Sequence, residues 1–212
     1  MDLDYFENHA VVMYKDMIER DEIFGENVQY LQAMLTQIVN SNTIKIKRTS
    51  EIEQGSSIED VPEETINYDY LVICTGTHYK MNENNVENLT NLFTLKQRHN
   101  FLSKYTEEIE KAESILVVGG GATGTECLGE IQTKYGNTKK YGLINSQDEL
   151  LAPFPATLRT KALTHFESTN TEIYLGQRYD PNGEIAKQYD FTIMCVGLSN
   201  YTPYMDNDKF QD

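Results

Sequence analysis

Ser114-Ile-Leu-Val-Val-Gly-Gly-Gly-Ala-Thr-Gly124 is the stretch of sequence that decides the fold of this chain. Its first five residues form a short apolar run, which is typical of a strand buried on both faces. The segment from Thr125 to Tyr135 follows the glycines and has helical periodicity, with Leu128 and Ile131 on its inner face. The stretch therefore predicts a buried strand, a glycine loop and a helix in direct succession.

Gly119, Gly121 and Gly124 have the spacing G-x-G-x-x-G. In this spacing the first glycine permits a tight turn, the second lets the backbone approach a pyrophosphate, and the third lets the helix pack close to the strand. The amides at the helix start, around Ala122 and Thr123, can then hold a diphosphate without a cationic side chain. We therefore predict an α/β, Rossmann-like dinucleotide-binding domain. The alternative is a glycine-rich turn that binds nothing.

The neighbouring segments fit alternating strands and helices. Further strands are expected at Tyr141 to Ile144, Thr171 to Leu175 and Asp190 to Val196. Helices are expected at Leu95 to Ala112 and Leu158 to Glu167. In the first of these helices, we expect Phe101, Leu102, Tyr105 and Ile109 to face inward.

The first part of the chain has a weaker pattern. Leu3 to Ile18 has the apolar spacing of an amphipathic helix. The segments Val28 to Val39 and Thr43 to Lys47 can pair as antiparallel strands across an Asn-rich turn. Glu51 to Glu64 reads as a loop, and Tyr68 to Cys74 reads as a strand buried on both faces.

Two stretches of the chain resemble each other. Tyr68 to Gly76 and Tyr189 to Gly197 both begin with Tyr-Asp and an aromatic residue, continue with an apolar run, and end with Cys, one residue and Gly. Two related nucleotide-binding modules in one chain would produce this pairing.

The predicted second strand ends at Ile144, where a Rossmann site usually has an acid that binds the ribose. Here Asn145 takes that place and can still hydrogen-bond a hydroxyl, with Asp148 and Glu149 slightly further on. No Arg stands there to receive a 2′-phosphate, which favours NAD over NADP. Glu126 either compensates the helix dipole on the first turn or contacts the cofactor near its nicotinamide end.

Composition excludes several classes of function. The 212 residues suggest one or two domains, and a net charge of -15 argues against nucleic acid and against an anionic membrane surface. No apolar run is long enough to span a bilayer, and the start of the chain is not a targeting signal, so we expect a soluble intracellular protein. The three cysteines are far apart without a C-x-x-C, which predicts buried free thiols and no zinc site.

Gly119 to Glu130 resembles the NAD-binding loop of two-dinucleotide-domain flavoproteins, the pyridine nucleotide-disulfide oxidoreductase superfamily. The closest branch is that of type II NADH dehydrogenases and of apoptosis-inducing-factor-like or ferroptosis-suppressor-like proteins. Tyr68 to Thr77 is similar to that family's strand "YDYLVIATG", and Asp190 to Gly197 is similar to its later strand. Leu150-Leu151 with Pro153 and Pro155 is similar to its loop after the second strand.

The resemblance implies an NAD-binding domain at 114–197, inserted in a partial FAD-like domain at 1–113 with a return segment at 198–212. Besides the glycine loop and Asn145, it places Thr75, Gly76 and Gly197 beside cofactors. NAD(H) is expected to bind. A tightly held FAD is doubtful on this chain alone, because no glycine loop precedes residue 76 and the N- and C-terminal parts of the FAD domain are missing.

Two functions remain open. In the first, NADH passes a hydride to a flavin, and electrons continue to a quinone-like acceptor, if the chain is a fragment of a complete enzyme. In the second, the chain is a catalytically inactive structural subunit of a larger assembly with protein partners. The sequence has no redox-active cysteine pair, which argues against the disulfide-reductase branch.

Overall fold

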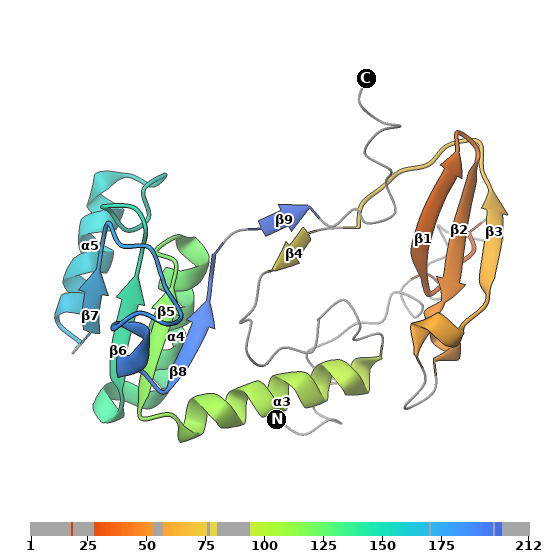
Figure 1. Cartoon of the computed structure of the whole chain (residues 1–212). Helices are drawn as coiled ribbons and strands as arrows, with labels where there is room; N and C mark the ends of the chain where they lie inside the picture. Colours follow the sequence, from red (N-terminus) through yellow and green to blue (C-terminus); the bar gives the residue numbers. More distant parts are fainter. Residues whose placement is uncertain are drawn as a thin grey trace. The chain divides into compact units, whose positions relative to one another are not determined.

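The computed structural model describes residues 18, 28–52, 57–75, 77–79, 94–169, 171–196 and 198–200 (Figure 1). The helix predicted from Leu3 onward lies outside the described residues except for its last residue, Ile18, which is helical. The described part of the chain forms two compact units. One unit holds the residues up to Thr75 together with 94–103 and Asn200, and the other holds 77–79 and 104–199.

The second unit is built on a parallel sheet. Its strands are β5 (Ser114–Val118), β6 (Lys140–Ile144), β7 (Thr171–Tyr174) and β8 (Phe191–Met194). They lie in the order β7-β6-β5-β8, and every neighbouring pair is parallel (Figure 1). This arrangement confirms the predicted α/β fold with a Rossmann-like sheet.

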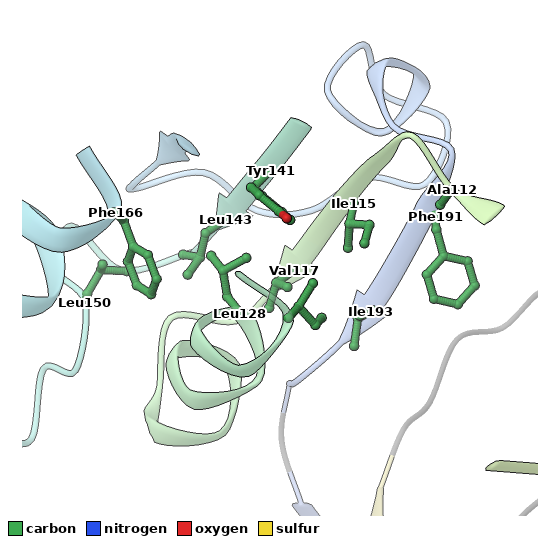
Figure 2. Close-up of a cluster of buried hydrophobic side chains, with 11 residues drawn as sticks. Ala112, Ile115, Val117, Leu128, Tyr141, Leu143, Leu150, Phe166, Phe191 and Ile193 are labelled. Atoms are coloured by element: carbon green, nitrogen blue, oxygen red, sulfur yellow. The ribbon is translucent and has the colours of Figure 1, made fainter. Parts of the chain in front are cut away.

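The helices α4 (Ala122–Tyr135) and α5 (Ala156–Glu167) cover one face of this sheet. Because side chains alternate along a strand, Ile115 and Val117 point to that face and pack with Leu128 of α4 and Phe166 of α5 (Figure 2). The buried core there comprises Ala112, Ile115, Val117, Leu128, Ile131, Tyr141, Leu143, Leu150, Phe166, Phe191 and Ile193. Leu116 packs on the opposite face.

The helix α3 (Leu95–Lys111) precedes β5 and contributes to the same core. Tyr105 and Ile109 pack against it, and the Tyr105 ring meets Phe191 edge-on at 5.2 Å between ring centroids. Leu102 is 48% exposed, so its predicted inner position is wrong. The stripe of inward-facing residues on this helix is therefore narrower than the sequence predicts.

The first unit contains an antiparallel sheet of β1 (Ala33–Asn40), β2 (Thr43–Arg48) and β3 (Glu63–Asn67), in that order. The pairing of Asn40 with Thr43 across a two-residue turn confirms the predicted hairpin. The strand β3 overlaps the end of the segment predicted as a loop. The acidic residues of β3 made the segment resemble a loop in the sequence. In the structure Glu63 lies in the strand and forms an ion pair with Lys45 of β2, with 3.2 Å between the charged atoms.

The predicted buried strand Tyr68 to Cys74 is wrong. Among the described residues this run belongs to no strand, Tyr70 is 93% exposed, Val72 is 81% exposed, and the Cys74 thiol is exposed as well. A buried parallel strand pairs along its edges with other strands of a sheet whose two faces are covered, and no strand of the described residues pairs with this run. The residues just beyond the two similar stretches do pair, as β4 (Thr77–Tyr79) and β9 (Leu198–Asn200).

Asp190 joins the starts of β8 and β5. Its carboxylate accepts hydrogen bonds from Ser114 Oγ at 2.8 Å, Ser114 N at 2.9 Å and Glu113 N at 3.0 Å. In return, Ser114 Oγ accepts from the Asp190 N–H at 2.9 Å. These bonds, led by that from the Ser114 hydroxyl, hold the pKa of the Asp190 carboxyl below its usual 3.8.

We expect Asp190→Asn to lower the free energy of unfolding by about 1 kcal/mol at neutral pH. The effect is modest because water competes with the exposed carboxylate for the same donors. Because the folded pKa is depressed, the contribution is complete above the unfolded pKa and is lost as the pH falls through the folded pKa. Urea denaturation from about pH 6 down to about pH 2 should therefore show the two proteins converging below about pH 4. A constant difference down to about pH 2 would contradict this role of the carboxylate.

Candidate functional site

The glycine loop lies where the carboxyl ends of three strands meet. Directly after β5, the Gly119 N–H donates to the Ile144 carbonyl at the end of β6, at 2.8 Å. On the other side, the Cys195 N–H, just after β8, donates to the Val118 carbonyl at 2.7 Å. The loop thus begins between β6 and β8, where the strand order changes direction. Ligands of open α/β sheets bind at such a point.

Two of the glycines are required by close packing of the backbone. Gly119 has a φ of +113°, and a Cβ there would lie 2.5 Å from the Cys195 carbonyl oxygen. A Cβ on Gly124 would lie 1.9 Å from the Gly119 carbonyl oxygen. Neither contact can be relieved by a side-chain rotation, because the opposing atoms are backbone. The helix start is therefore held tightly against the strand end, as the spacing predicts.

Gly121 differs from both of them. A Cβ there would meet nothing within 4 Å, and the residue is exposed. Gly121 is the N-cap of α4 without a side-chain cap, and the first helical bond runs from the Thr125 N–H to the Gly121 carbonyl at 3.0 Å. The N–H groups from Gly121 to Gly124 precede that bond and have no intrahelical acceptor. Ala122 is half-buried and Thr123 exposed, so open space lies beside amides that can bind an anion.

Asn145 holds this loop from the side of β6. Its Oδ1 accepts from the Gly120 N–H at 3.1 Å, while its Nδ2 donates to the carbonyls of Glu149 at 2.9 Å and Gln147 at 3.2 Å. The Leu151 N–H donates to the Gly120 carbonyl at 2.7 Å, so the Gly120 peptide is fixed at both ends. Asn145 is therefore a positioning residue for the loop. Its predicted contact with a ribose remains a prediction.

Leu151 also belongs to the site, although the sequence alone assigned it no role there. Leu151 has a φ of +52°, which is uncommon for a residue with a Cβ, and this conformation accompanies its N–H bond to Gly120. The sequence did indicate this position, because Leu150-Leu151 with the two following prolines is similar to the family's loop. That similarity did not show what the leucines do. Leu150 is buried, and its Cδ2 would lie 2.6 Å from a Cβ on Gly120.

The Asn145 contacts also explain why an amide rather than an acid stands at this position. In Asn145→Asp, an oxygen would replace the Nδ2 that faces the Gln147 and Glu149 carbonyls. We expect the variant to lose about 2–3 kcal/mol of unfolding free energy, since a buried charge would face two acceptors. Urea denaturation checks this, with Gln147→Ala as control, because that side chain is exposed. Equal stability of Asn145→Asp and the unchanged protein would contradict the role of the Nδ2.

The other predicted site residues are not gathered at the loop by the described structure. Glu126 is exposed on the second turn of α4, because the helix begins at Ala122 and not at Thr125 as predicted. This position argues against a role of Glu126 in compensating the helix dipole, because that effect acts within the first turn. Thr75 is exposed and belongs to the other unit, and Gly76 and Gly197 lie outside the described residues. Cofactor contacts of these residues stay predictions.

The charge around the loop comes from the backbone. The stretch from Ser114 to Cys127 contains no Lys, Arg or His. Within the described ranges, no group of three or more His, Cys, Asp or Glu side chains could hold a metal ion. In the same ranges, no helix has the length and apolar character that a membrane span requires. Within that stretch, the groups that can attract a phosphate are the main-chain amides and the helix dipole.

Comparison with known proteins supports this geometry. The model of the pyridine nucleotide-disulphide oxidoreductase family matches residues 6–202. The chain belongs to this family. Among the curated relatives, Fe-regulated protein 8 of Mycosarcoma maydis is 28% identical over 163 residues, which cover 69% of this chain and 41% of the relative. Apoptosis-inducing factor homolog B of Dictyostelium discoideum is 26% identical over 189 residues, or 80% of this chain and 47% of the relative.

A solved structure with the same fold is that of NDH2 from Plasmodium falciparum in complex with NADH. It has a TM-score of 0.51 and 21% sequence identity, covering 82% of this chain and 41% of that one. At this identity the likeness shows the fold alone. The family match, together with this apoptosis-inducing factor homolog and a probable NADH dehydrogenase of Dictyostelium discoideum that is 26% identical over 189 residues, confirms the resemblance to that branch of the family. The chain spans less than half the length of these curated relatives.

Proposed function

We propose that the unit around residues 114–197 binds NAD(H) and serves a flavoprotein oxidoreductase. The observation that carries this proposal is the open space at Gly121, which lies beside uncapped amides on a loop fixed by Asn145. A diphosphate fits such a place, since it needs several N–H donors and no Cβ in its path. Family membership gives the same expectation from an independent source.

Each part of the site has a role in this proposal. The amides from Gly121 to Gly124 hold the pyrophosphate, and Gly119 and Gly124 keep the loop against the sheet. NAD(H) is favoured over NADP(H), because the next cation after β6, Arg159, is ion-paired with Glu149. Thr75, Gly76, Glu126 and Gly197 are proposed as further contacts of the cofactors.

NADH supplies a hydride when bound, and in this family's reaction we propose that a flavin receives it and passes electrons to a quinone-like acceptor. The chain's own residues would position the dinucleotide and would not donate or accept protons. A probable NADH dehydrogenase among the relatives supports this choice of reaction. The described residues contain no second loop like Gly119–Gly124 that would hold a flavin nucleotide.

A second candidate is a catalytically inactive subunit that retains the fold within a larger protein assembly. The run Tyr68 to Cys74 favours it, since the exposed side chains of Tyr70, Val72 and Ile73 pair with no strand of the described residues and offer an apolar surface on which a partner can pack. In this candidate the chain can still bind NADH and report its presence. The two candidates differ in whether electrons leave the nucleotide.

Three measurements on the purified chain separate these functions. We expect NADH fluorescence to change on titration with the protein, which tests the glycine loop. Yellow colour and NADH-driven reduction of a quinone or a dye support the oxidoreductase. Binding without colour or reduction supports the inactive subunit and refutes catalysis by this chain. NADH fluorescence that never changes refutes NAD(H) binding and leaves only a structural role.

A further inference from the structure

The fold brings two cysteines together that lie far apart in the sequence. Cys127 is on α4, three residues after Gly124, and Cys195 directly follows the end of β8. A Cβ on Gly124 would lie 3.2 Å from the Cys195 Cβ, and residues three apart are neighbours on a helix surface, so Cys127 lies on the part of α4 that faces Cys195. Both thiols are free and half-buried. Because the two residues lie far apart in the chain, the sequence alone does not indicate a pair. The pair exists only because α4 packs against the end of β8.

The packing around Cys195 is tight on the side of the glycine loop. A Cβ on Gly124 would lie 3.2 Å from the Cys195 Cβ, and a Cβ on Gly119 would lie 2.5 Å from its carbonyl oxygen. Both thiols also pack at the margin of the core on the α4 face. Cys195 therefore lies directly against the glycine loop, and Cys127 lies one helical turn further along α4.

The pKa values of the two thiols shift in opposite directions. The neighbouring Cys195 thiol lowers the pKa of Cys127, although burial opposes this change. The neighbouring Cys127 thiol, together with burial, raises the pKa of Cys195. A thiolate is the attacking species in disulfide exchange, so Cys127 is the nucleophile and Cys195 the resolving thiol.

We propose that Cys127 and Cys195 form a redox-active thiol pair that closes to a disulfide by exchange with a small disulfide such as oxidised glutathione. The Cys127 thiolate attacks one glutathione sulfur, the glutathione S–S bond breaks, and one glutathione leaves. Cys195 then loses its proton and attacks the Cys127 sulfur, which displaces the second glutathione. Two protein thiols are oxidised to one disulfide, and one oxidised glutathione is reduced to two thiols that take up the two protons.

The disulfide would tie α4 to β8 beside the glycine loop. Because Cys195 touches the positions of Gly119 and Gly124, a shift of its backbone reaches the amides of the loop. We expect the oxidised protein to bind NADH several-fold more weakly than the reduced protein. This consequence rests on the proposed function, whereas the disulfide itself does not.

The test uses a Cys74→Ser variant of the full chain, which removes the exposed third cysteine. The folded protein is incubated with oxidised glutathione, alkylated, and examined by intact mass and peptide mapping. We expect both thiols to become inaccessible to alkylation and one peptide to join Cys127 to Cys195. Dithiothreitol should restore both thiols. In urea the same treatment should give mainly glutathione adducts, because the two sulfurs are no longer held together.

Two further variants assign the roles. With Cys195→Ser added, the reaction should stop at a glutathione adduct on Cys127. With Cys127→Ser added, Cys195 should stay largely open to alkylation. Two alkylatable thiols after oxidation of the folded protein, or adducts without a joined peptide, would overturn the proposal. If the disulfide forms and NADH affinity is unchanged, the link to the loop fails. If reduced protein does not bind NADH, the proposed function fails and the thiol pair stands.

Discussion

Gly124→Ala should lower the free energy of unfolding of this chain by about 3 kcal/mol, at the upper end of what one added methyl group costs in a packed interior. The new Cβ would lie 1.9 Å from the Gly119 carbonyl oxygen and 3.2 Å from the Cys195 Cβ. Because the first of these atoms is backbone, the start of α4 must move away from the end of β5. Urea denaturation followed by circular dichroism measures the loss.

The same helix offers a matched control. Gly129 also lies within α4, but a Cβ there would meet nothing within 4 Å. We expect Gly129→Ala to leave stability unchanged or to raise it by about 0.5–1 kcal/mol, because alanine favours a helix over glycine. If both variants have the same stability, the close approach of α4 to β5 does not exist in solution.

Gly121→Val should have the opposite profile, with normal stability and lost nucleotide binding. The residue has a φ of -78° and extended backbone, which valine adopts without strain, and its Cβ has free space around it. The valine would fill the space in which we propose that the diphosphate lies. We expect the dissociation constant for NADH to rise about 100-fold, which corresponds to about 2.7 kcal/mol.

Two titrations on each protein decide the matter: NADH fluorescence for affinity and urea for stability. The control is again Gly129→Ala, which should bind NADH like the unchanged protein because it lies further along α4. If Gly121→Val binds NADH as tightly as the unchanged protein, the glycine loop is not the nucleotide site. If Gly121→Val unfolds, the space beside Gly121 is already filled by the protein.

The predicted elements around the loop were correct where the evidence for them is local. The run Ser114 to Val118 and the helical pattern after it became β5 and α4, with Leu128 and Ile131 buried as expected. The run Tyr68 to Cys74 carries an equally strong apolar signal, yet it enters no strand among the described residues. Apolarity shows that a segment can be buried in a sheet, but the presence of flanking strands decides whether it is.

The domain boundary at 114 and the inserted arrangement stay predictions, although the described structure divides near them. The longer segment of the second unit begins within α3, because Tyr105 and Ile109 pack on the core of the parallel sheet. The charge pattern of this helix marks an exposed surface. It does not indicate where along the helix the contacts with the sheet begin.

The sequence by itself determined the class of fold and the place of the candidate site, because glycine spacing, strand length and helical period act between residues that are close in the chain. Only the tertiary structure decided that the Asn145 amide holds the loop, that Gly121 faces open space while Gly124 does not, and that Cys195 lies against α4 one turn before Cys127. Each of these depends on contacts between distant segments, which form when the helices pack on the sheet. No local pattern encodes such contacts.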